Sequence, residues 1–98
     1  PFRDQDLIDR IRKALEKDRQ NREMLRQREQ IRRRLDALTA RERQVLELMI
    51  QGTQNKVMAA HLGISQRTVE IHRAHVMEKL GANSVAQLVR MVLDAGQA

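Results

Sequence analysis

Three histidines, His61, His72 and His75, are the side chains best suited to metal binding or proton transfer at neutral pH. His61 falls in a different predicted helix from the other two, which have no Cys, Asp or Glu companion at ligand spacing, so we predict no metal site. The chain has no cysteine, which excludes disulfides, thiolate nucleophiles and Cys-ligated zinc. It also has no nucleophile paired with a base and no phosphate loop. We therefore expect neither an enzyme nor a cofactor.

A different chemistry is suggested by residues 66–80, which predict a helix with two unlike faces. Val69, His72, Val76 and Leu80 follow one another at steps of 3, 4 and 4 and form an inward stripe, with His72 in a structural role as a hydrogen-bonded core histidine. The opposite face carries Arg67, Glu70, Ile71, Ala74 and Glu78. The first four of these lie in the N-terminal half, which is the end that a DNA recognition helix presents to base edges.

The elements that must position this helix are marked by Gly52, Gly63 and Gly81 and by the cap-type residues Thr39, Ser65 and Ser84. They divide residues 38–98 into four short helices, at about 40–51, 54–61, 66–80 and 84–95. Thr39 followed three residues later by Glu42 predicts a capping box. Two interpretations of Glu42 stay open: a partner in that cap, or a buried charge paired with Arg41 or another arginine.

The segment from His61 to Ser65 predicts the turn of a helix-turn-helix motif. Gly63 stands where a left-handed residue ends one helix, and Ser65 can cap the next. The helix before the turn should face inward with Val57, Met58 and Leu62. A helix, a short turn containing glycine and a capped second helix are the signature of this DNA-binding motif.

The last predicted helix has more apolar surface than a small domain needs. One face carries Val85, Leu88, Val89 and Val92, and another carries Ala86, Arg90 and Leu93. We expect the second face to pair with a second copy of the chain.

The N-terminal segment predicts one nearly continuous helix, because residues 4–36 contain no Gly or Pro. One apolar stripe contains Leu7, Ile8, Ile11, Ala14 and Leu15, and a heptad-like one contains Met24, Ile31, Leu35 and Leu38. The stripes could lie against a partner helix, a second copy or another domain, or the segment could be a solvated linker. A coiled-coil interaction module is a rival function, although Asp18 and Arg28 interrupt it. The run Arg32-Arg33-Arg34 is interpreted as aiding solubility rather than DNA binding.

Composition supports an all-α fold with one small core. The 98 residues are 41% hydrophobic and 1% aromatic. The net charge of +6 suggests an anionic partner, yet residues 1–38 hold 12 Lys and Arg against 8 Asp and Glu, and residues 39–98 only 7 against 5. No stretch is apolar enough for a membrane segment or signal peptide, so we expect a soluble, cytoplasmic protein with no membrane partner.

The region from Leu38 to about Leu93 closely resembles the LuxR/FixJ-type helix-turn-helix domain of bacterial response regulators. The matching residues are Leu38, Thr39, Arg41, Glu42, Val45, Leu46, Gly52, Asn55, Lys56, Ala59, Leu62, Ile64, Ser65, Thr68, Val69, His72, Val76, Lys79 and Leu80. Met58 departs from the usual isoleucine, a swap of similar volume. The resemblance divides the chain into residues 1–37, the last receiver helix and the interdomain linker helix, and residues 38–98, the DNA-binding domain. Pro1-Phe2 resembles the turn before the last receiver helix.

The resemblance implies a transcription regulator that binds double-stranded operator DNA as a homodimer. Its base contacts would be Glu70, Ile71, Ala74 and Arg67, with a phosphate as the favoured target of Arg67. Its phosphate contacts would be Asn55, Lys56, Thr68 and Lys79, and the dimer would form through Ala86, Arg90 and Leu93. It further implies a receiver domain controlled by a cognate sensor kinase, and RNA polymerase as a further partner. Half-sites would lie about 10 base pairs apart.

Overall fold

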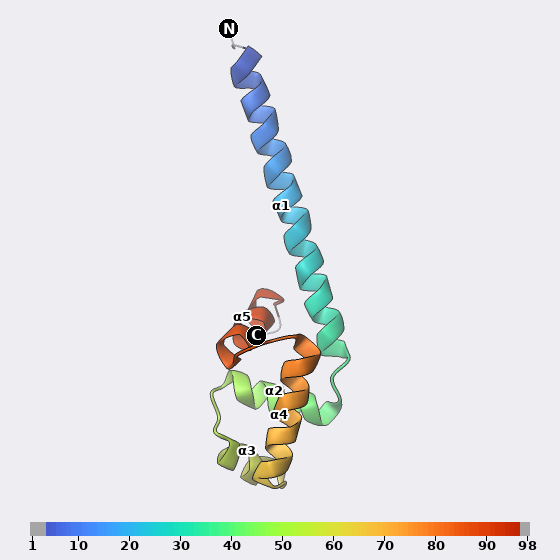
Figure 1. The fold of residues 1–98 in the computed structure, drawn as a ribbon, viewed down its shortest axis with the longest axis vertical. Coiled ribbons are helices and arrows are strands. Elements are labelled where there is room, and N and C mark those ends of the chain that lie inside the picture. Colours follow the sequence, from blue (N-terminus) through green and yellow to red (C-terminus); the bar gives the residue numbers. More distant parts are fainter. Residues whose placement is uncertain (1–3, 97–98) are drawn as a thin grey trace.

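A long helix projects from a small bundle of four shorter ones in the computed structural model, which describes residues 4–96 (Figure 1). The described helices are α1 (Asp4–Asp36), α2 (Ala40–Ile50), α3 (Asn55–Leu62), α4 (Gln66–Leu80) and α5 (Val85–Asp94). The all-α prediction is confirmed, and the bounds of α1 and α4 are those expected from sequence. The predicted Pro1-Phe2 turn lies outside the described residues.

Local side chains fix where the short helices begin. The Thr39 hydroxyl accepts a hydrogen bond from the Glu42 backbone N–H at 3.1 Å, and the Glu42 carboxylate accepts one from the Thr39 N–H at 2.9 Å. This reciprocal pair is the predicted capping box. The Ser84 hydroxyl likewise accepts from the Gln87 N–H at 3.1 Å at the start of α5. Both signals depend on neighbours within one turn, which is why they can be recognised from sequence.

All five helices contribute to one hydrophobic core. Its buried side chains include Leu35, Val45, Leu46, Met49, Met58, Ala59, Val69, Val76, Leu80, Leu88 and Val92. The prediction that Val57 faces inward is wrong, since its side chain is 54% exposed while the neighbouring Met58 is fully buried. The eight-residue α3 buries Met58 and Ala59 against the bundle, and Val57 lies outside that buried side of the helix.

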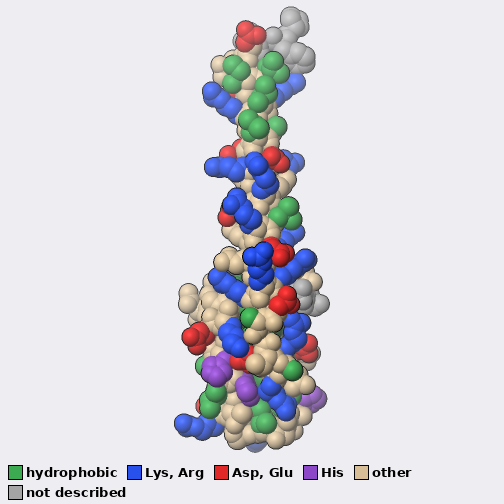
Figure 2. Space-filling model, turned by 90° about the vertical axis from the view of Figure 1, so that its right-hand side faces the viewer, with side chains coloured by type: hydrophobic (Ala, Val, Ile, Leu, Met, Phe, Trp, Pro, Cys, Tyr) green, Lys and Arg blue, Asp and Glu red, His purple; other side chains and the backbone are tan. Residues whose placement is uncertain are grey.

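The C-terminal turns of α1 belong to this core, whereas most of α1 stands in solvent. Leu35 is buried and Ile31 packs against the core. Met24, which was expected to continue the same stripe, is exposed. Ion pairs along the exposed part join Glu16–Arg19, Asp18–Arg22, Glu23–Arg26 and Glu29–Arg33. Figure 2 shows the resulting mixture of acidic and basic side chains along this exposed part of α1, called the arm below.

Among residues 4–96, apolar side chains remain uncovered on two of the surfaces expected to meet partners. One is the N-terminal stripe of α1, in which Leu7, Ile8, Ile11 and Leu15 are all exposed. The other is on α5, where Leu88 and Val92 pack inward while Ala86, Arg90 and Leu93 lie exposed. Val85, expected on the inner face of α5, is the first residue of the helix and is 38% exposed.

Candidate nucleic-acid interface

The turn between α3 and α4 has the geometry predicted for a helix-turn-helix motif. Gly63 ends α3 in the left-handed conformation with φ of 67°, which a residue with a Cβ adopts only at a cost. The Ile64 N–H then donates to the Ala59 carbonyl at 3.0 Å, which closes the end of α3. Directly afterwards, the Ser65 hydroxyl accepts from the Thr68 N–H at 3.1 Å and starts α4.

Opposite faces of α4 differ as the sequence predicted. Val69, Val76 and Leu80 have no exposed surface, because α4 packs on α2 and α3 through this side. The opposite face holds Arg67, Glu70, Ile71, Ala74 and Glu78, all of them exposed. Ile71 is 46% exposed although it is a large apolar residue. The fold therefore brings the four predicted base contacts together on one accessible surface, while their contacts with DNA remain a prediction.

His72 lies on the inner side of α4 and is half-buried, as a structural residue would be. Its Nδ1 atom, however, is buried and has no hydrogen-bond partner among the described residues. The expectation of a fully hydrogen-bonded core histidine is therefore wrong in that part.

Two hydroxyl groups meet at the start of α4. The Ser65 and Thr68 side-chain oxygens are 2.8 Å apart, and either can be the donor. The pair has two hydroxyl hydrogens, and the bond between them uses one. One hydroxyl hydrogen consequently stays available for an external acceptor at the N-terminal end of α4.

The start of α3 is open in a comparable way. Gln54 is its N-cap residue, but its side chain makes no cap hydrogen bond. The first backbone N–H groups of a helix need partners and carry positive partial charge. Lys56 is exposed and Asn55 is half-buried at this same end. The predicted phosphate contacts Asn55 and Lys56 therefore stand beside backbone donors that no side chain caps.

A buried carboxylate joins α2 to α4. Glu42 is 3% exposed, and its Oε1 atom lies 2.6 Å from the Lys79 Nζ. The Nδ1 of His75 lies 3.5 Å from Oε2. The Lys79 hydrogen bond, with the Thr39 N–H adding to it, lowers the pKa of Glu42 from 4.5 to about 2 against the opposing effect of burial.

This cluster corrects the expected partner of Glu42, whereas the phosphate contact of Lys79 stays a prediction. Glu42 is both a cap partner and a buried charge, but its cationic partner is Lys79 rather than an arginine. Arg41 instead approaches the Leu62 carbonyl at 3.5 Å. Lys79, predicted to contact a phosphate, already has its ammonium engaged within the fold. Sequence reasoning missed the pair because 37 residues separate its members.

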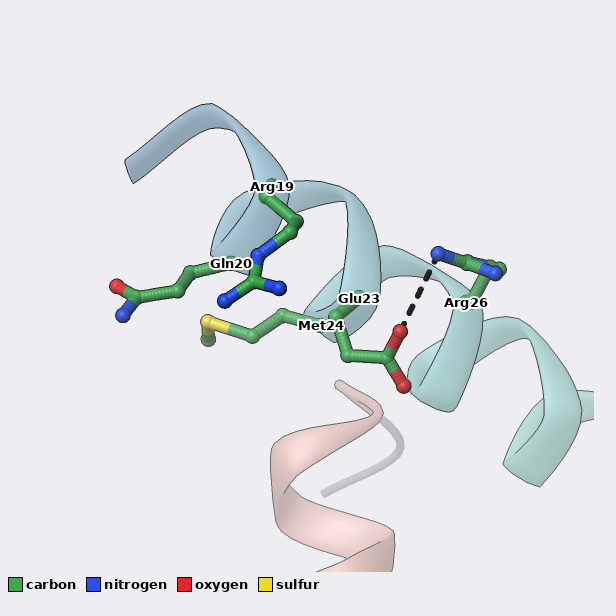
Figure 3. A pocket seen from close by; sticks show the side chains of 5 residues that line it. All are labelled: Arg19, Gln20, Glu23, Met24 and Arg26. Carbon is green, nitrogen blue, oxygen red and sulfur yellow. Dashed lines mark ion pairs between the residues drawn. The ribbon is translucent and has the colours of Figure 1, made fainter. Parts of the chain in front are cut away.

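Residues 4–96 contain no group of three or more His, Cys, Asp or Glu placed to hold a metal ion. A hollow beside α1 is lined by Arg19, Gln20, Glu23, Met24 and Arg26 (Figure 3). These described lining residues all come from one exposed helix, and Glu23 and Arg26 pair with each other at 3.2 Å. No second element adds a polar group that would orient a ligand there.

A protein-family model described as "Bacterial regulatory proteins, luxR family" matches residues 36–92, which is more than half of the chain. The chain belongs to the luxR family. The predicted resemblance is thereby confirmed, and the matched range covers the end of α1, the helix-turn-helix motif and most of α5.

Relatives of this luxR-family chain include a transcriptional regulatory protein and a nodulation protein. It is 44% identical over 98 residues to the transcriptional regulatory protein FixJ of Azorhizobium caulinodans, covering 100% of this chain and 46% of that protein. It is 44% identical over 91 residues to nodulation protein W of Bradyrhizobium diazoefficiens, covering 93% of this chain and 40% of the relative. The chain thus spans less than half the length of these relatives.

Solved structures agree with the fold over nearly the whole chain. Full-length FixJ from B. japonicum superposes with a TM-score of 0.74 at 39% identity, covering 100% of this chain and 48% of that one. The response regulator StyR gives a TM-score of 0.80 at 40% identity over 95% of this chain and 47% of its own.

Membership of the luxR family gives the domain its class. It is a DNA-binding helix-turn-helix domain of the kind that forms the output part of response regulators, and its family is not enzymatic. Within residues 4–96, no helix combines the length and apolarity needed to span a bilayer.

Proposed function

We propose that this chain binds operator DNA as a dimer, with α4 of each copy in the major groove, and regulates transcription in the bacterial cytoplasm. The observation that carries the proposal is the exposed outer face of α4, from Arg67 to Ala74, held outward by a fully buried face. A helix is about 10–12 Å across with its side chains, which fits a major groove about 12 Å wide.

Sequence discrimination is assigned to four residues on that face. The Glu70 carboxylate can accept a hydrogen bond from cytosine N4, and Ile71 and Ala74 can pack on a thymine methyl group. Arg67 can bind a guanine edge or a phosphate, and its place in the first turn favours the phosphate. Because the face has a single cation, its contribution is selectivity more than general attraction.

Affinity is assigned to groups around α4. Lys56 supplies an exposed cation, Asn55 an amide, and the Thr68–Ser65 pair its remaining hydroxyl hydrogen. The N–H groups at the start of α3 can add donors toward the same phosphate oxygens. We assign Lys79 to the fold instead, because its ammonium lies 2.6 Å from the buried Glu42 carboxylate and neutralises its charge.

Selection from randomised double-stranded oligonucleotides, followed by footprinting, tests the proposal directly. We expect an enriched, two-fold related motif with half-sites about 10 base pairs apart. Binding should weaken steeply as salt rises, because phosphate contacts release counterions. If the selection enriched no sequence motif even at low salt, the proposal would be refuted.

Matched variants can separate the residues assigned to sequence discrimination from those assigned to affinity. Glu70→Ala should change the preferred base at one position about tenfold or more, whereas Glu78→Ala, on the same face two turns further on, should not. Lys56→Ala should weaken binding to cognate and scrambled DNA alike and lower the salt slope by about 1. Lys17→Ala on the exposed arm serves as its control. If Glu70→Ala weakened binding to cognate and scrambled DNA equally, Glu70 would not be a base contact.

Dimerisation is assigned to the outer face of α5. Leu93 is 48% exposed beside Ala86 and Arg90, while the other side of the helix is buried in the core. Leu93→Glu should leave the monomer folded and abolish two-site occupancy on DNA, which sedimentation and footprinting can measure. Leu93→Met keeps an apolar side chain at this position and should retain two-site occupancy. Occupancy of both half-sites by Leu93→Glu would exclude this face of α5 as the dimer interface.

The N-terminal arm is assigned to the last receiver helix, residues 4–17, and to an interdomain linker, residues 18–37. A receiver would cover the exposed stripe of Leu7, Ile8, Ile11 and Leu15, and phosphorylation by a sensor kinase would then control pairing. Contact with RNA polymerase would follow at the promoter. Ile11→Ser should leave sedimentation and operator binding of this chain unchanged. A loss of self-association would favour the coiled-coil alternative instead.

A further inference from the structure

The C-terminal ends of α1 and α4 lie next to each other in the fold (Figure 1). The Arg34 Nη1, near the end of α1, donates to the Leu80 carbonyl, the last of α4, at 3.0 Å. In the other direction, the Lys79 Nζ, near the end of α4, donates to the Ala37 carbonyl just beyond α1 at 3.5 Å. Each helix end therefore supplies a cation to the final carbonyls of the other.

These two hydrogen bonds offset an electrostatic repulsion between the helix ends. The last carbonyls of a helix have no partner within it and carry negative partial charge, so two C-terminal ends side by side repel each other. At the end of α4, the N–H groups of Gly81 and Ala82 already bond to the carbonyls of Glu78 and Met77. The Leu80 carbonyl receives its donor from Arg34 instead, at a partly buried site where such a bond is screened less.

The space for Arg34 is provided by a missing side chain. Gly81 has a φ of 68°, and a Cβ built on it would lie 2.9 Å from the Arg34 Nη1. The glycine thus serves both the turn and the close approach of the guanidinium. Arg34 is half-buried, in contrast to the exposed Arg32 and Arg33. The three consecutive arginines therefore do not form one patch, and the third has a separate role.

Neighbouring contacts tighten the same junction. Leu35 is 2% exposed in the core, and its carbonyl accepts a hydrogen bond from the Arg43 Nη2 of α2 at 3.3 Å. Lys79 is itself held by the Glu42 carboxylate at 2.6 Å. The last turn of α1 is consequently fixed to both α2 and α4.

We propose that Arg34 is a positioning residue that locks the arm α1 to the end of α4, so that both helices move as one body. A rotation imposed on the arm is then passed to α4, and the direction of the arm is fixed by the placement of α4. The consequence for DNA rests on the proposed role of α4, but the lock itself does not. It can be tested without DNA.

The chain has no cysteine, so a pair of spin labels can be attached at Lys17→Cys and Glu78→Cys, both on exposed surface. Residue 17 lies about 26 Å along the helix from Arg34, so a swing of about 10° moves it by roughly 4–5 Å. Pulsed electron–electron double resonance resolves a change of this size. We expect a narrow distance distribution in the labelled parent protein.

Arg34→Ala should broaden that distribution at least twofold, and Arg34→Lys should give an intermediate width because it keeps the cation but loses the planar fork. Arg33→Ala, which removes only an exposed pair with Glu29, should match the parent. Methyl resonances of the buried Val69 confirm that each variant keeps its core. Equal widths for Arg34→Ala, Arg33→Ala and the parent would overturn the proposal, and so would a broad distribution in the parent. Neither result would bear on DNA recognition by α4.

Discussion

Replacing Glu42 by glutamine should lower the free energy of unfolding at neutral pH by about 1–3 kcal/mol. The glutamine keeps the size of the side chain and one acceptor oxygen, but it removes the charge that pairs with Lys79 at 2.6 Å. A folded-state pKa of about 2 against an ordinary 4.5 corresponds to a ceiling of roughly 3 kcal/mol. The lower bound reflects water around the Lys79 side chain, which is 38% exposed and therefore screened.

The sign of the pH dependence follows from the direction of the shift. Because the pKa of Glu42 is lower in the folded state, its contribution is complete above about 4.5 and disappears as the pH falls through about 2. The stability difference between the parent and Glu42→Gln should therefore shrink by about half or more between pH 7 and pH 3. Glu47→Gln, an exposed carboxylate of the same helix, should show little difference at either pH.

Urea unfolding is the suitable assay, with the methyl resonances of Val69 and Leu88 as probes. Both side chains are fully buried in the core, whereas helical ellipticity also contains the signal of the 33 residues of α1, most of which are outside it. An equal stability difference between the parent and Glu42→Gln at pH 7 and pH 3 would exclude a stabilising charge on Glu42.

Four further substitutions can be tested with the same unfolding measurement. Gly63→Ala should cost about 1–2 kcal/mol from its left-handed backbone alone, since nothing lies within 4 Å of its Cβ position. Gly81→Ala should cost more because of Arg34, and this excess should vanish in an Arg34→Ala background; an excess that persists would exclude the steric explanation. Met58→Ala should cost about 2–5 kcal/mol, whereas Val57→Ser should stay within about 0.5 kcal/mol. A large effect of Val57→Ser would mean that α3 is oriented differently.

The sequence was most informative where structure depends on neighbouring residues. Thr39 and Ser65 cap α2 and α4 as predicted, because a cap involves groups three residues apart. Gly63 ends α3 as predicted, because the left-handed conformation is a property of the residue itself. The recognition face of α4 was also recovered, because a stripe repeating every three or four residues marks the buried side of a helix.

Prediction failed where several orientations satisfy the same local pattern. Val57 and Met58 are adjacent apolar residues, and their sequence does not say which one a short helix buries. Met24 continues the spacing of Ile31 and Leu35, yet it stands beyond the reach of the core. Whether an apolar position is buried depends on what the rest of the chain places opposite it.

The sequence by itself therefore determined the helices, the caps of α2, α4 and α5, the helix-turn-helix motif and the face of α4 that is presented outward. Only the tertiary structure decided which distant charges meet. Glu42 pairs with Lys79, and Arg34 donates a hydrogen bond to the Leu80 carbonyl, 46 residues away in the sequence. The physical reason is range: caps and amphipathic stripes are encoded within one or two turns of helix, whereas a charge finds a distant partner only when packing brings the two helices together.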